Sequence, residues 1–375
     1  MRGLAIVLGL SCCLAACGGR SHRGQGAPAE PGGPAAGSAG VSGAAGSASS
    51  SSPEGCFGIA TETTEATLLA AVSAKLGLSV TAGSVDASEP NIYVRGQQLV
   101  DAVALALESQ PLPAQSRQIL RDFVGQLVGE NLFSLPAALP ADEQELYARQ
   151  LDGFAERWAV GQLDSLEFLL TGAPPEALGA PPEQLAGIMT LGAFLARVPS
   201  PPERAMYLAE TLGCTTIPPP PPIMMSTWDS QPKQPAKNVV LGQYGDDQTP
   251  CVACHTHYIG YAIALDRYDE LGRYRESLNG LGIDTGYGLT MPAFFPHPAA
   301  IDGQRVEFAT PSELGRALSE AGGVRACLVR KLNEQLSGSA LTDEEVGCLL
   351  DDWAATHNDF VALLALLAPR FAIAP

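Results

Sequence analysis

Apolar side chains recur every three or four residues along much of this 375-residue chain. That interval places them on one face of an α-helix. In residues 113–128, for example, Ile119, Phe123 and Leu127 fall on one side. The same spacing predicts further helices over residues 141–160, 182–198 and 201–213. Strand-like alternation is scarce, so the pattern predicts an all-α fold.

Two helices near the C-terminus are predicted to begin with capping boxes. Thr310 and Thr342 each stand three residues before a glutamate, an arrangement in which side chains satisfy the free N–H groups of a helix start. Helices predicted over residues 323–336 and 343–356 should form an antiparallel hairpin, because only a short loop separates them. The C-terminal region is therefore expected to be a helical hairpin.

The first residues have the features of a secretion signal. In residues 1–16, Arg2 precedes an apolar run that is too short to span a bilayer. Residues 14–17 read Leu-Ala-Ala-Cys and resemble the lipobox of bacterial lipoproteins, which implies that Cys17 receives a diacylglyceryl group. The alternative is an ordinary cleaved signal that leaves Cys17 as a free thiol. We expect an extracytoplasmic protein with a lipid anchor in a bacterial membrane, and Gly18, in place of an aspartate retention signal, favours the outer membrane.

Residues 17–55 are expected to be a disordered tether. Of the 38 residues from 18 to 55, 31 are Gly, Ala, Ser or Pro, and such a segment cannot bury enough apolar surface to offset its ordering entropy. As a flexible coil it would reach about 35 Å. The tether would hold a folded body away from the membrane.

The charge balance excludes nucleic acid as a partner. The chain has 22 Lys and Arg against 40 Asp and Glu, a formal net charge of −18, and nucleic-acid binding needs a basic face. The acidic surface is most simply a solubility device, and the alternative is steering toward a basic redox partner. Five consecutive prolines at residues 218–222 mark an internal boundary, as a stiff spacer or as a docking site for a proline-reading partner.

The chemistry of the chain is concentrated at residues 251–255, which read Cys-Val-Ala-Cys-His. The C-x-x-C-H arrangement is typical of c-type haem attachment, in which Cys251 and Cys254 form thioethers and His255 is the proximal iron ligand. A zinc site would need four converging ligands, and a thioredoxin-like pair would need an α/β domain. A disulfide between the two cysteines would close a strained small loop. The motif therefore predicts one covalently attached haem c.

Beyond this motif, the chain resembles the planctomycete-type cytochrome c-like proteins. Their pattern is a cysteine and several prolines before C-x-x-C-H, then F/Y-D-x-x-G-R-Y/W-R, then Ile-Asp. The matching segments here are Gly213-Cys214, the proline run, residues 251–255, Tyr268-Asp269-Glu270-Leu271-Gly272-Arg273-Tyr274-Arg275 and Ile283-Asp284. Further matches, at Ser312-Glu313-Leu314 and Arg325-Ala326-Cys327, imply that a small C-terminal helical domain follows the haem domain.

The chain is therefore expected to have five parts: a signal peptide (1–16), a lipid-anchored tether (17–55), a helical domain (56–215), a c-type haem-binding domain (216–309) and a C-terminal helical domain (310–375).

The distal iron ligand is open among four residues. Met291 precedes a proline, and this Met-Pro pair is similar to the distal-ligand loop of small cytochromes c. His297 would give bis-His ligation, and Met224 or Met225 come third. His257 is excluded, because it lies only two residues after His255.

Four further cysteines are expected to form two disulfides, because an even number in an oxidising compartment favours pairing. We expect Cys327 to pair with Cys348, since the C-terminal hairpin should place them at similar heights. Cys56 would then pair with Cys214 by elimination.

Two functions fit these features. The preferred one is a monohaem c-type cytochrome that passes single electrons to or from a redox partner. The alternative is a haem-containing subunit or catalytic component of an extracytoplasmic oxidoreductase, peroxidase-like if the iron is five-coordinate. Residues 56–215 display no nucleophile with a base, no carboxylate pair and no phosphate loop, which favours the carrier.

Overall fold

The computed structural model describes residues 56–160, 165–176, 179–199, 201–215, 261, 264–265, 267–278, 281–282, 297–308 and 310–373. The signal peptide, the tether with Cys17, the C-x-x-C-H motif and Met291 lie outside the described residues.

The described chain is mainly helical, which confirms the all-α class. The elements before residue 216 are α2 (Glu65–Leu76), α3 (Ile92–Ser109), α4 (Ala114–Leu127), α5 (Ala141–Ala159), α6 (Ser165–Thr171), the 3₁₀ helices η1 (Pro182–Gln184) and η2 (Gly187–Thr190), α7 (Gly192–Arg197) and α8 (Pro201–Leu212). Those after residue 260 are β1 (Ser277–Leu278), β2 (Leu281–Gly282), β3 (His297–Ile301), β4 (Gln304–Phe308), α13 (Pro311–Glu320), α14 (Gly322–Ser337), α15 (Asp343–Ala355), α16 (Phe360–Leu366) and α17 (Ala368–Ala372).

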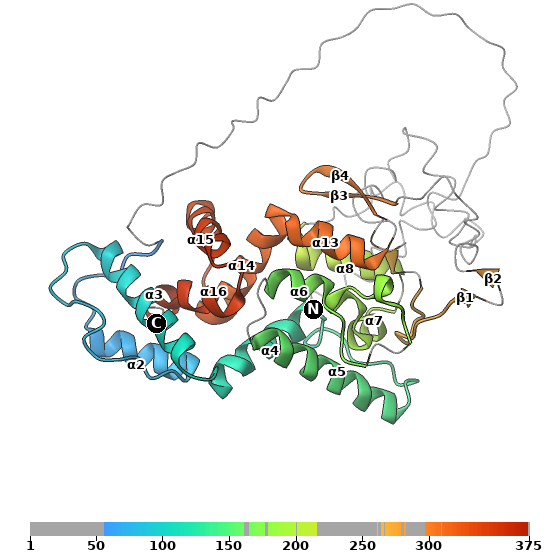
Figure 1. Ribbon diagram of the computed structural model, residues 1–375, viewed down its shortest axis with the longest axis horizontal. Helices are drawn as coiled ribbons and strands as arrows, with labels where there is room; N and C mark the ends of the chain where they lie inside the picture. The colour runs from blue at the N-terminus through green and yellow to red at the C-terminus, as the bar shows by residue number, and fades with distance from the viewer. Residues whose placement is uncertain are drawn as a thin grey trace, which may run out of the picture.

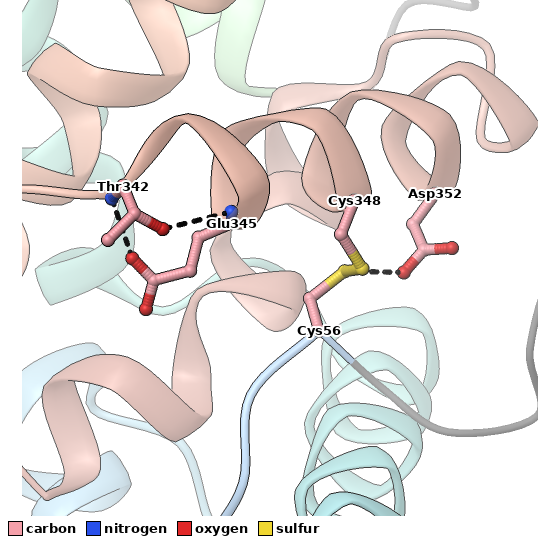
Figure 2. The surroundings of a disulfide bond; sticks show 5 residues. All are labelled: Cys56, Thr342, Glu345, Cys348 and Asp352. Atoms are coloured by element: carbon pink, nitrogen blue, oxygen red, sulfur yellow. Dashed lines mark hydrogen bonds between the residues drawn. A yellow bond between two sulfur atoms is a disulfide. The ribbon is translucent and has the colours of Figure 1, made fainter. Parts of the chain in front are cut away.

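Local capping explains several helix boundaries. The Thr342 hydroxyl accepts a hydrogen bond from the Glu345 N–H at 3.2 Å, and the Glu345 carboxylate accepts one from the Thr342 N–H at 2.7 Å, which confirms the predicted capping box of α15 (Figure 2). Thr310 likewise accepts from the Glu313 N–H at the start of α13. At the other end of a helix, Gly77 closes α2 in the left-handed conformation with φ of 69°.

The prediction of a single long helix over residues 182–198 is wrong. The structure has η1, η2 and the short α7 there. Gly187 explains the break, because it adopts a φ of +48° and a Cβ at this position would lie 2.0 Å from the Leu169 carbonyl oxygen. The chain turns where it passes directly against the backbone of α6, and a helix cannot continue through that turn.

In the described part of the chain, the sheet structure consists of two short antiparallel hairpins, β1–β2 and β3–β4. In the second, Ile301 pairs with Gln304, and Asp302 and Gly303 form the turn with φ of 52° and 72°. Positive φ at both turn residues is typical of a type I′ hairpin, for which Asp-Gly is a favoured sequence. This hairpin was not expected from the sequence.

One hydrophobic core joins the described residues before residue 216 with those after residue 260. The Phe360 ring of α16 lies 4.6 Å from the Trp158 ring of α5 and 4.9 Å from the Trp353 ring of α15, between centroids. Figure 1 shows the C-terminal helices, in orange and red, among the N-terminal helices in blue and green. The expected boundary at residue 310 therefore separates two stretches of chain that share one core.

The four cysteines form two disulfides, as expected, but the predicted partners are wrong. Cys56 bonds to Cys348, and Cys214 bonds to Cys327, with Cα–Cα distances of 5.6 and 5.4 Å. Cys327 lies ten residues before the end of α14, whereas Cys348 lies five residues after the start of α15. At about 1.5 Å per residue their heights differ by about 8 Å, too far for a disulfide.

Candidate functional site

The residues predicted to bind haem, Cys251, Cys254 and His255, lie outside the described residues, as does Met291. His297 is described only in its backbone, as the first residue of β3 opposite Phe308. The structure does describe two places that flank residues 216–260: the end of α8 with Cys214, and the stretch of residues 267–278. The contacts at these two places define the candidate site.

At the first of them, Cys214 is fixed two residues after α8. Its disulfide to Cys327 ties it to α14, and Cys327 is buried with 1% of its surface exposed. Next along the chain, the Thr215 N–H donates to the Ala209 carbonyl at 3.1 Å, which closes the end of α8. The chain therefore departs from a covalently fixed point.

At the second place, Tyr268 secures the returning chain. Its side chain is 3% exposed, and its hydroxyl donates to the Gln184 carbonyl. Burial raises the pKa of this hydroxyl above its ordinary value, so it stays a donor. The Tyr274 ring packs edge-on against Tyr268 at 5.8 Å between centroids. Leu265 and Tyr261, just before, are also buried.

A tight turn follows at Asp269. One oxygen of its carboxylate accepts hydrogen bonds from the Leu271 and Arg273 N–H groups, each at 2.9 Å. Gly272 completes the turn with φ of +81°, and a Cβ there would lie 2.9 Å from the Gly192 carbonyl oxygen. Glycine is thus required both for the backbone conformation and for the close approach to α7.

Two side chains of α5 hold the same turn. The Tyr147 hydroxyl donates to the Leu271 carbonyl at 2.7 Å, and burial raises the pKa of Tyr147 to about 12. The Glu143 carboxylate accepts two hydrogen bonds from the Arg273 guanidinium, at 2.7 and 2.9 Å. The turn is therefore fixed to α5 as well as to α7.

Arg204 of α8 lies buried at the centre of these contacts, and sequence reasoning missed it. Its side chain is fully buried. The guanidinium donates to three carbonyls at 2.8 Å, those of Leu195, Val198 and Tyr268, and also to the Asp269 carbonyl. A planar cation with five donors suits such a cluster of oxygens. The available signal was its position four residues before Leu208, on the apolar stripe of α8.

These contacts assign a physical role to the motif in residues 268–275. Tyr268 is buried, and the half-buried Tyr274 packs against it. Asp269 and Gly272 form the turn, and Arg273 makes the ion pair with α5. The motif acts as an anchor that holds residues 268–275 to the helical body.

One cluster of potential metal ligands occurs in the described part of the chain. The sulfurs of Cys56 and Cys348 and a carboxylate oxygen of Asp352 lie within 4.8 Å of one another. The two sulfurs are bonded to each other, so they do not offer thiolate ligands in this state.

Residues 185–278 match the family model PSCyt3, described as a protein of unknown function (DUF1588). The matched stretch contains α7, α8, the C-x-x-C-H motif and the anchor of residues 268–275. No curated protein and no solved structure matches the chain. The chain is thus similar, over about a quarter of its length, to a cytochrome-associated domain family.

No helix in the described part of the chain has both the length and the apolar character needed to cross a membrane.

Proposed function

We propose that this protein is a monohaem c-type cytochrome that passes single electrons between extracytoplasmic redox partners. The observation that carries the proposal is the position of the C-x-x-C-H motif. It lies inside the family-matched stretch 185–278, between a disulfide-fixed departure point and a buried return anchor. Such an arrangement suits a segment that must hold a cofactor against a rigid body.

The donor set fits haem c. Cys251 and Cys254 have the spacing that thioether attachment requires, and His255 stands beside them as the proximal ligand. The four cysteines of the described body pair with one another, so the body does not need the motif cysteines for its own disulfides. Bound haem c would supply one-electron oxidation and reduction.

The chain's own residues position this segment. Cys214 fixes its start to α14, while Arg204 and Tyr268 fix its return to α7, α8 and η1. Both attachments use buried or covalent contacts, which resist thermal opening better than exposed ion pairs do.

Met291 is the proposed distal ligand, because its Met-Pro pair is similar to the distal-ligand loop of small cytochromes c, and its thioether would raise the reduction potential of a bound haem. Met291→Ala should lower the potential and let the reduced protein bind carbon monoxide, whereas the matched change His297→Ala should do neither. If the wild-type protein already binds carbon monoxide rapidly and Met291→Ala changes nothing, the result would contradict the electron-carrier function and favour a peroxide-activating haem enzyme. A spectral change in His297→Ala alone would indicate bis-His ligation and a lower-potential carrier.

Lipidation of Cys17 is proposed as the membrane attachment. The mature protein should partition into the detergent phase and incorporate a fatty-acid label, and Cys17→Ala should lose both properties. Equal recovery of the wild-type protein and Cys17→Ala in the aqueous phase would contradict lipidation of Cys17.

A further inference from the structure

Asp352 lies directly against the disulfide that begins the folded body. Cys56 is the first described residue, and its bond to Cys348 ties the start of the body to α15. Asp352 follows Cys348 by one helical turn and points its carboxylate at the bond, with Oδ2 3.2 Å from the Cys56 sulfur (Figure 2). All three side chains are half-buried.

This contact places a carboxylate against a disulfide sulfur that has no hydrogen to donate to it. A disulfide sulfur carries no proton, so an intact Cys56–Cys348 bond offers the carboxylate no thiol hydrogen. The surroundings already disfavour negative charge, because burial raises the pKa of Asp352 and repulsion from Asp351 adds to that rise. A second negative charge at the neighbouring sulfurs would be costlier still.

We propose that Asp352 protects the Cys56–Cys348 disulfide from reduction by thiols. Exchange begins when a thiolate attacks one sulfur, forms a new S–S bond and expels the other sulfur as a thiolate. The Asp352 carboxylate opposes both the incoming and the departing charge. Complete reduction by a dithiol passes two electrons to the disulfide, the two cysteines take up two protons, and the dithiol leaves as its own disulfide.

The proposed haem attachment gives this protection a use, and that use rests on the proposed function. Thioether formation requires Cys251 and Cys254 as free thiols, whereas the helical body keeps its four cysteines as disulfides. A dithiol reductant that acts on this chain must therefore distinguish the two sets of sulfurs. A carboxylate placed against one disulfide provides such a distinction for that bond.

The test is the rate of reduction of each disulfide in the full chain. Wild type, Asp352→Asn and Asp351→Asn are treated with dithiothreitol at one pH, free thiols are trapped by alkylation, and each cysteine is followed by peptide mass spectrometry. Asp352→Asn should speed the loss of Cys56–Cys348 about fivefold or more, the factor that one unit charge about 4 Å away produces even at the dielectric constant of water. Asp351→Asn removes the same charge one residue away and should stay within about twofold of wild type, because the Asp351 carboxylate is not part of the cluster of Cys56, Cys348 and Asp352, whose atoms lie within 4.8 Å of one another.

The Cys214–Cys327 bond is the internal control and should be reduced at an unchanged rate in all three proteins. Equal or slower loss of Cys56–Cys348 in Asp352→Asn overturns the proposal. A faster loss shared by both disulfides also overturns it, because the change would then act through general unfolding. The readout needs no haem, so a chain without covalent haem would refute the proposed function and leave this result unaffected.

Discussion

Replacing Arg204 with methionine removes the charged centre of the anchor while keeping most of its apolar volume. The guanidinium donates to carbonyls of Leu195 and Val198 at the end of α7 and to those of Tyr268 and Asp269 in the returning chain. All four oxygens would lose this donor inside the core. The change should therefore loosen the junction between α7, α8 and residues 267–275.

The magnitude follows from the number and type of these bonds. A hydrogen bond to a charged group contributes about 1.5 to 3 kcal/mol, and a buried acceptor left without a partner costs about 1 to 3 kcal/mol. These contributions are not additive when the groups belong to one cluster. We expect Arg204→Met to lower the free energy of unfolding by about 3 to 5 kcal/mol, a large fraction of the roughly 5 to 15 kcal/mol typical of a folded protein.

The assay combines urea unfolding with hydrogen exchange of residues 267–278. Arg95→Met is the matched control, because Arg95 is also fully buried and donates to the Ala60 and Thr63 carbonyls, far from the anchor in sequence. Both variants should lose stability, but only Arg204→Met should speed exchange in residues 267–278 beyond the global loss. A loss below about 1 kcal/mol, or the same exchange pattern in both variants, would refute the assigned role of Arg204.

Two further predictions concern the backbone and the disulfides. Gly272→Ala should lower the unfolding free energy by about 1 to 3 kcal/mol, because it adds left-handed strain and a contact with the Gly192 carbonyl. Gly303→Ala should lower it less, because Gly303 has a similar φ but open space around its Cβ position. Equal losses in the two variants would contradict the steric argument. Changing Cys56 and Cys348 together to serine should lower the unfolding free energy by about 2 to 5 kcal/mol, and a non-reducing peptide map that joins Cys348 to any other cysteine would contradict the pairing.

Features encoded by neighbouring residues could be predicted from the sequence. The helix predicted over 113–128 is observed as α4, and the one predicted over 141–160 is observed as α5. The capping box at Thr342 needs only residues three apart, so it too was predictable. These features depend on contacts within one or two turns of chain.

Features encoded by distant contacts could not be predicted. The disulfide partners are 292 and 113 residues apart in sequence, and their choice depends on α14 packing against α8 and on α15 reaching the start of the body. The break at Gly187 depends on its approach to the α6 backbone. The role of Arg204 depends on carbonyls supplied by two separate segments, which periodicity along one helix does not reveal.

The central claim is covalent haem at residues 251–255, and retention of haem under denaturing conditions tests it most directly. The full chain, produced in a bacterium that matures c-type cytochromes, should keep haem through denaturing electrophoresis and acid-acetone extraction, because thioethers are covalent and axial bonds are not. The joint change Cys251→Ala and Cys254→Ala should abolish this retention. A colourless wild-type protein, or covalent haem that persists in the double variant, would contradict the account.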